Sequence, residues 1–178
     1  MKKSVFIPIL GMVLVGLVFA VSCKKEEKTE SNPQIVQPEQ PVDEYVDLGL
    51  PSGTLWKDTN ESVNDTIYFT HARAMALFGD NVPTKEQFDE LDSLCEWTWI
   101  GDGYEVVGPN DNSIFLPALG GYPTVGSLFG YGFEGNYWTS TLDGSTHVWS
   151  YYFYDGTVIS SSILPNCKMN VRLVKKNE

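Results

Sequence analysis

The 178-residue sequence predicts an α+β domain in which two helices pack on antiparallel hairpins. Two segments early in the folded part combine helix-capping residues with apolar residues every three or four positions. Turn signals separated by alternating apolar and polar residues follow them, interrupted by a long loop rich in glycine and aromatic residues. We expect the folded part to begin near Glu44 and to form a single domain.

Each predicted helix begins at a threonine that can cap it. Thr70 precedes the first helix, which Gly79 stops, and Thr84 with Gln87 forms a capping box for the second helix. The apolar positions are Ala72, Ala74, Met75, Ala76, Leu77 and Phe78 in the first helix, and Phe88, Leu91, Leu94 and Cys95 in the second. We expect both helices to pack on one sheet.

Turn residues mark the hairpins that follow. A turn cluster at 108–112 lies between two apolar runs, and Asp155-Gly156, a preferred type I′ pair, separates two β-rich runs. Trp149, Tyr151 and Phe153 alternate with Tyr152 and Tyr154, so the first set is expected in the core with Trp138, and the second on the other face. The final "MNVRLV" is expected as a strand in the middle of the sheet or beside the first strand.

The N-terminal residues have the order of a secretory signal. Lys2 and Lys3 precede an apolar run at 5–21, and small residues lead to Cys23, so residues 1–22 are predicted to be removed. A membrane-spanning helix is the weaker alternative, because the run is slightly short of the usual ~20 residues and Pro8 interrupts it.

The stretch "AVSC" resembles the lipobox of bacterial lipoproteins. The resemblance implies that Cys23 carries diacylglycerol and a further acyl chain such as palmitate, which together anchor the chain firmly. The following Lys24, Lys25, Glu26 and Glu27 resemble the signal that sends Bacteroidetes-type lipoproteins to the outer face of the outer membrane; the alternatives are a plain solvated charge run and a periplasm-facing anchor.

The segment 23–43 is predicted to be a disordered tether. It is rich in Glu, Gln, Pro and Ser and carries few apolar residues, so it cannot bury enough surface to fold. Without residues 1–22 the chain has 10 basic and 23 acidic side chains, a net charge of −13. That charge argues against nucleic acid and anionic membrane surfaces as partners.

Six segments of the chain occur in a characteristic order: "EYVDLGLPSGTLW", "VPTKEQFDEL", "CEWTW", "GPNDNSIFLPALGGY", "YWTSTLDG" and "VRLV". In this order they resemble the Fibrobacter succinogenes major paralogous domain family. The resemblance extends from Glu44 to about Val174 and implies a C-type-lectin-like fold for 44–178. That architecture is also the one of formylglycine-generating enzymes and of a phage tropism determinant. Between Trp56 and His71 the chain is shorter than many members, so ligand contacts of that insert are not carried over.

No pattern of catalytic or metal-binding residues emerges from the sequence. His71 and His147 are far apart and are expected to be a polar helix end and a half-exposed strand residue. Asn110, Asp111 and Asn112 offer oxygens for calcium but are also typical of a tight turn. The acidic side chains of the second helix, Glu86, Asp89, Glu90 and Asp92, are expected to be solvated. We therefore expect no enzyme, no metal and no cofactor.

Cys95 and Cys167 remain if Cys23 is acylated. In an oxidising compartment they are candidates for a disulfide; two separate buried thiols and, less favoured, a reactive pair are the alternatives.

The glycine-rich loop offers the candidate ligand contacts, Tyr122, Phe129, Tyr131 and Phe133. Such rings suit a glycan or a protein partner, although aromatic residues also pin loops to their own sheet. The expected function is a monomeric, non-enzymatic binding module on the cell surface. The alternatives are an envelope-structural lipoprotein without a soluble ligand and a relative of formylglycine-generating enzymes.

Overall fold

The computed structural model describes residues 44–123 and 126–176. The chain divides into two units, Met1–Glu39 and Gln40–Glu178, and every described residue belongs to the second. The predicted signal peptide, Cys23 and the tether therefore lie outside the described residues. Within the described ranges, no helix is long and apolar enough to cross a membrane.

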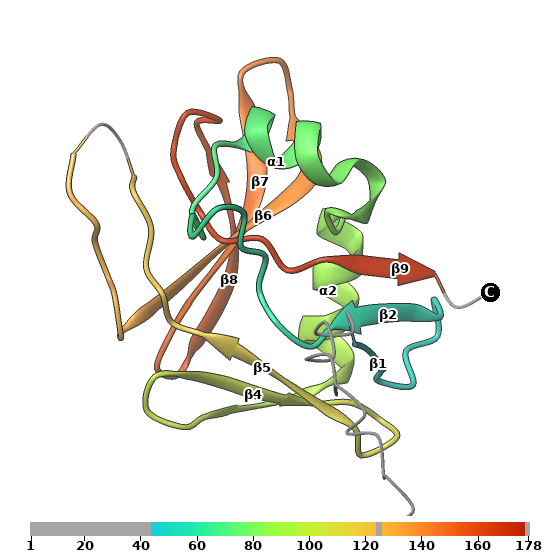
Figure 1. Cartoon of the computed structure of the whole chain (residues 1–178). Coiled ribbons are helices and arrows are strands. Elements are labelled where there is room, and N and C mark those ends of the chain that lie inside the picture. The colour runs from blue at the N-terminus through green and yellow to red at the C-terminus, as the bar shows by residue number, and fades with distance from the viewer. Residues whose placement is uncertain (1–43, 124–125, 177–178) are drawn as a thin grey trace, which may run out of the picture. The chain divides into compact units, whose positions relative to one another are not determined.

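The described chain contains two short α-helices, a 3₁₀ turn and three antiparallel sheets of three strands each (Figure 1). This arrangement confirms the predicted α+β class. In chain order the elements are β1 (Tyr45–Asp47), β2 (Thr54–Lys57), α1 (His71–Phe78), η1 (Gly79–Asn81), α2 (Lys85–Leu94), β3 (Glu96–Trp99), β4 (Gly103–Val107), β5 (Ser113–Pro117), β6 (Glu134–Asp143), β7 (His147–Tyr154), β8 (Thr157–Ile163) and β9 (Val174–Lys176). The sheets are ordered β1-β2-β9, β3-β4-β5 and β6-β7-β8.

Both helices begin at the predicted caps. The Thr70 side chain accepts a hydrogen bond from the Arg73 backbone, and both hydrogen bonds of the capping box between Thr84 and Gln87 are present. The apolar faces are narrower than predicted, because the helices are short and each contacts the core along one edge. Ala72, Ala76, Leu77 and Leu94 are exposed, and Cys95 is half-buried.

The two helices cover opposite faces of the β6-β7-β8 sheet. Tyr137 and Trp138 are neighbours on β6, so their side chains project to opposite faces. Tyr137 packs in one core cluster with Phe88 of α2, and Trp138 packs in a second cluster with Ala74 of α1. Both helices contact β6, which confirms that they pack on one sheet.

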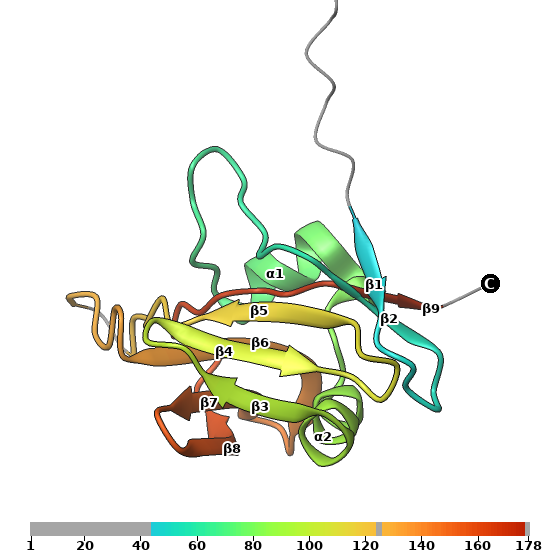
Figure 2. The same cartoon turned by 90° about the horizontal axis from the view of Figure 1, so that it is seen from below.

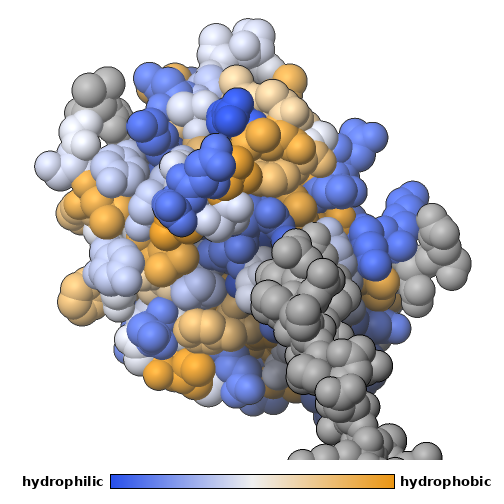
Figure 3. Space-filling model, in the orientation of Figure 1, coloured by the Kyte–Doolittle hydropathy of each residue, from blue (hydrophilic) through white to orange (hydrophobic). Residues whose placement is uncertain are grey.

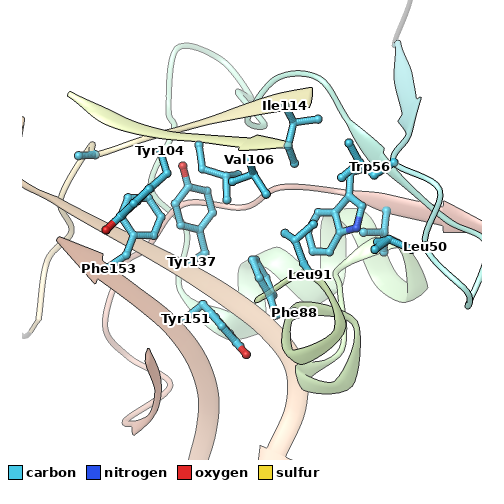
Figure 4. Packing of buried hydrophobic residues seen from close by; sticks show 14 residues of the cluster. Leu50, Trp56, Phe88, Leu91, Tyr104, Val106, Ile114, Tyr137, Tyr151 and Phe153 are labelled. Atoms are coloured by element: carbon cyan, nitrogen blue, oxygen red, sulfur yellow. The ribbon is translucent and has the colours of Figure 1, made fainter. Parts of the chain in front are cut away.

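The first core cluster joins all three sheets. Trp56 of β2, Tyr104 of β4 and Phe153 of β7 converge with Phe88 of α2, as Figure 4 shows. The stacked rings of Phe88 and Tyr151 are 4.6 Å apart between centroids. Figure 2 shows the β3-β4-β5 sheet in front, with α2 at one end.

The hairpins are where the turn signals predicted them, with two corrections. β4 and β5 flank the turn at 108–112, and β7 and β8 flank Asp155-Gly156. The latter turn is not type I′, because Gly156 has a φ of 75° whereas Asp155 is not among the described residues with positive φ. The last strand, β9, begins only at Val174 and pairs with β2 at a sheet edge, so it lies neither in the middle of the sheet nor beside β1.

The set of aromatic residues predicted for one side of the β7 hairpin is split. Tyr151 and Phe153 are buried together with α2, as expected, and Tyr152 and Tyr154 lie on the opposite face of β7. Trp138 instead belongs to the α1 cluster, and Trp149 is half-buried beneath Lys85, whose Nζ is 5.1 Å from the ring centroid. The bulge between Trp138 and Leu142 interrupts the β6–β7 register at this point.

Candidate binding surface

One end of the β6-β7-β8 sheet has a face that neither core cluster includes. Glu134 pairs with Tyr154, and Asn136 pairs with Tyr152, so these four side chains share a face. Ile159 of β8 pairs with Tyr152 and is 46% exposed. We call Glu134, Asn136, Tyr152, Tyr154 and Ile159 the open face.

The glycine-rich loop borders the open face and is held by backbone hydrogen bonds. Gly121 and Phe129 exchange two hydrogen bonds of 3.0 and 2.9 Å, and the Glu134 N–H donates to the Gly130 carbonyl at 2.8 Å. Gly130 has a φ of +75°, and a Cβ there would lie 2.4 Å from Oε2 of Glu134. Glycine at this position therefore lets the turn approach the carboxylate closely.

The four predicted loop aromatics have different surroundings. Phe129, Tyr131 and Phe133 are 63%, 61% and 74% exposed. Tyr122 instead is half-buried, with its ring edge-on to Tyr68 at 5.2 Å and Lys168 Nζ 5.8 Å from its centroid. Tyr122 pins the loop, whereas the other three rings face solvent.

Tyr131 lines neither of the clefts that Phe129 and Phe133 border. Its proximity to Tyr68 contributes to raising the pKa of the Tyr68 phenol, after burial and Tyr122. In Figure 3 hydrophobic residues reach the surface along the left edge, where Figure 1 draws the loop between β5 and β6.

Two clefts meet at the open face. The first, of about 360 Å³, is lined by Tyr122, Phe129 and Asn136 over a floor of Ile163 and Met169. The second, of about 690 Å³, is lined by Trp99, Phe133, Tyr154 and Asp155. Glu134 and Tyr152 line both clefts, so the two clefts form one continuous candidate surface.

Glu134 and Tyr152, which line both clefts, interact with each other. Burial, followed by the hydrogen bond and the negative charge of Glu134, raises the pKa of Tyr152 to about 12. The Tyr152 and Tyr154 ring centroids are 5.6 Å apart. The surface thus presents the carboxyl group of Glu134, the phenols of Tyr152 and Tyr154 and the exposed Phe129 and Phe133 rings side by side.

A further hollow of about 750 Å³ lies beside β9 and the start of α2. Lys175 and Lys176, at its rim, adjoin residues 177–178, which lie outside the described ranges. Gln87 and Thr84, also at its rim, are already engaged in the capping box. We therefore do not assign a ligand to this hollow.

The two histidines lie in different surroundings. His71 is buried, against the expectation of a polar helix end: its Nε2 lies 3.1 Å from the Thr139 carbonyl oxygen and its ring meets Trp138 edge-on. Burial lowers its pKa, more than the carbonyl contact raises it. His147 is half-buried, with Nδ1 2.9 Å from Oγ1 of Thr146.

The polar residues of the 108–112 turn and of α2 have structural partners. The side-chain amides of Asn110 and Asn112 both donate to the Asp47 carbonyl, which ties the turn to β1. Asp89 accepts from Lys85 and Tyr151, and Glu90 accepts from the Ser52 backbone, so neither is merely solvated as predicted. Across the described ranges, no group of three His, Cys, Asp or Glu side chains is placed to hold a metal ion.

The candidate disulfide between Cys95 and Cys167 is not formed in this structure. Both are free cysteines, and they lie in different core clusters, Cys95 beside α2 and Cys167 beside α1. Burial raises the pKa of both thiols, that of Cys95 to about 11. The Cys167 thiol donates to the Pro123 carbonyl at 2.6 Å.

Comparison of the chain with protein-family models, curated proteins and solved structures finds no match. The candidate surface therefore stands on its own geometry. Sequence reasoning missed Trp99, Glu134, Asn136 and Asp155 as parts of it. Tyr152 and Tyr154 could have been found, because their alternation with Tyr151 and Phe153 already placed them on the uncovered side of β7.

Proposed function

We propose that the chain is a lipid-anchored binding module of C-type-lectin-like fold on the cell surface, without catalytic activity. Its ligand, a glycan or a surface protein, contacts the open face and the neighbouring loop. One observation carries the proposal: Phe129 and Phe133, 63% and 74% exposed, border two clefts that share Glu134 and Tyr152.

Exposed rings on a hydrogen-bonded loop suit ligand binding. Aromatic side chains bury a large area with few rotatable bonds, and a loop that is already ordered loses little entropy on binding. The two backbone hydrogen bonds between Gly121 and Phe129 hold the backbone of Phe129 in this way. The helices are less suitable, because Ala74 of α1 and Phe88 and Leu91 of α2 are buried in the core clusters and no exposed aromatic ring lies on either helix.

The resemblance to the Fibrobacter succinogenes major paralogous domain family supports the fold assignment, as do the two capped helices on one sheet. The lipobox-like sequence supports acylation of Cys23 and an outer-membrane location. A Cys23→Ser protein should leave the membrane fraction when cells are fractionated with detergent. Retention of the Cys23→Ser protein in the membrane fraction would contradict lipid anchoring through Cys23.

Two other functions remain as alternatives. An envelope-structural lipoprotein would have no soluble ligand. An enzyme of the formylglycine-generating type would need a reactive cysteine, and the raised pKa values of Cys95 and Cys167 argue against a stable thiolate in either position. Rapid alkylation of one of these thiols in the native protein would favour the enzyme.

An array of glycans and bacterial surface proteins, probed with the full chain in detergent, tests the proposed function. We expect at least one ligand whose binding is lost when Phe129 and Phe133 are both replaced by alanine. Replacement of the exposed Leu142, which borders neither cleft, is the matched control. Absence of any ligand would favour the envelope-structural alternative. Binding that survives the double replacement would contradict the assignment of the ligand contacts to Phe129 and Phe133.

A further inference from the structure

We propose that the second cleft binds the guanidinium group of an arginine side chain presented by a protein ligand. The inference rests on the proposed binding function and names the chemistry of the partner. It follows from three features of the cleft: its walls are aromatic, it contains two carboxylates, and no basic side chain is among its described lining residues.

The walls of this cleft are aromatic rings from three parts of the chain. Trp99 ends β3, Phe133 ends the glycine-rich loop, and Tyr152 and Tyr154 lie on β7. Trp99 is held edge-on to the buried Tyr104, with 5.2 Å between centroids. The faces of aromatic rings carry negative electrostatic potential and attract cations, guanidinium groups most often.

Two carboxylates belong to the same cleft. Glu134 lies beside Tyr152, and Asp155 lies in the β7–β8 turn. Burial raises the pKa of Tyr152, and the hydrogen bond and charge of the neighbouring Glu134 raise it further.

None of the described residues that line the cleft is basic. The lysines that do lie over aromatic rings are elsewhere: Lys85 over Trp149, Lys168 over Tyr122 and Lys175 over Tyr45. The second cleft thus offers rings and acidic groups without a basic side chain of its own. A cationic ligand would supply the complementary charge.

Guanidinium matches this set of groups better than ammonium. It is planar and weakly hydrated, so it can stack on a ring while donating two parallel hydrogen bonds to a carboxylate. An ammonium ion is more strongly hydrated and would lose more on entering an aromatic site. Anionic ligands are disfavoured by Glu134 and Asp155.

The rim favours a polypeptide as the source of the guanidinium. Ile100, between Trp99 and Gly101, is 54% exposed, and Ile159 on the open face is 46% exposed. Ile100 adjoins two lining residues along the chain, Ile159 pairs with the lining Tyr152, and the 74% exposed Phe133 lines the cleft itself, so apolar surface borders the cleft. Residues on either side of an arginine could cover this rim, in the manner of an interface whose centre is an anchor residue.

Titration of the full chain in detergent with three peptides tests the inference. The peptides are acetyl-Ile-Gly-Arg-Gly-Ile-amide and its citrulline and lysine counterparts, and binding is followed by NMR shifts of the Trp99 indole, assigned with a Trp99→Phe protein. Citrulline keeps the shape of arginine but is uncharged. We expect the arginine peptide to shift the Trp99 signal and to bind at least tenfold more tightly than either counterpart.

Charge-neutralising variants locate the binding site. Glu134→Gln and Asp155→Asn should each weaken binding of the arginine peptide at least fivefold, with unchanged melting temperatures. Glu105→Gln is the matched control, because Glu105 is an exposed carboxylate on β4 that does not line the cleft. Equal affinity for the citrulline or lysine peptide, or equal losses in all three variants, would overturn the inference.

Failure of the guanidinium site can be distinguished from failure of the proposed binding function. If the arginine peptide fails while a neutral oligosaccharide binds and is lost with Phe133→Ala, the guanidinium site is refuted and the binding module stands. If the array yields no ligand for this surface, the proposed function itself falls.

Discussion

At the scale of single residues, Arg172 is the most deeply buried charged side chain among residues 44–123 and 126–176. Its side chain is 1% exposed and donates to Asn60 Oδ1 at 2.8 Å, to the Lys57 carbonyl at 2.9 Å and also to the carbonyls of Asp58 and Phe115. One guanidinium thus joins β2, the segment after it and β5. Its energetic value lies in pairing a buried guanidinium with buried and part-buried oxygens that would otherwise lose their donor.

Replacing Arg172 by methionine should lower the free energy of unfolding by about 3 kcal/mol or more, because buried acceptors lose their donor. Urea denaturation of the full chain in detergent measures this. Arg73→Met, on the exposed side of α1, should change it by no more than about 0.5 kcal/mol. A loss of that small size for Arg172→Met would contradict the role given to the buried network.

His71 should make stability depend on pH. Burial lowers its pKa in the folded state, so between the unfolded value near 6.5 and the lower folded value the unfolded chain binds more protons. The contribution of His71 is therefore present above about pH 6.5 and is lost as the pH falls through the folded pKa.

Urea denaturation at pH 7.5 and at pH 5 should show a smaller drop in stability for His71→Asn than for the unchanged protein. His147→Asn serves as the control, since His147 is half-buried in another element. Parallel pH profiles for the His71→Asn and unchanged proteins would refute the link.

At the scale of elements, the sequence predicted the features that depend only on interactions between residues close together in the chain. The caps at Thr70 and Thr84 and the turn at 108–112 depend on neighbouring residues alone, and all three are where the sequence predicted them. The exposure of Leu94 and the late start of β9 depend on which partners the fold supplies. Those features cannot be read from periodicity.

Thr84→Ala should cost about 1 kcal/mol of stability, because the first turn of α2 would lose a hydrogen-bond acceptor. Thr84→Ser keeps the hydroxyl and should cost much less. Chemical denaturation of the two variants compares them directly. Equal losses would mean that the methyl group of Thr84, and not its cap, stabilises α2.

At the scale of the whole molecule, the candidate surface arises from packing between distant segments. Phe129 and Phe133 were predicted as ligand contacts from the glycine-rich loop alone, but Trp99 comes from β3 and Asp155 from the β7–β8 turn. Only the arrangement of the sheets brings these residues together. The separation of Cys95 from Cys167 has the same origin, because two cysteines in one sequence carry no information about their distance.

We propose that Phe129 and Phe133 are exposed for a ligand and do not hold the domain together. Thermal unfolding of the full chain with Phe129→Ala and Phe133→Ala combined tests it without knowledge of the ligand. Phe153→Ala is the matched control, since Phe153 is 1% exposed and such core truncations cost about 3–5 kcal/mol. We predict a shift of at most about 2 °C for the double variant and many degrees for Phe153→Ala. A fall of many degrees in the double variant would show that these rings pack the loop against the sheet, which would contradict the assignment of a binding surface.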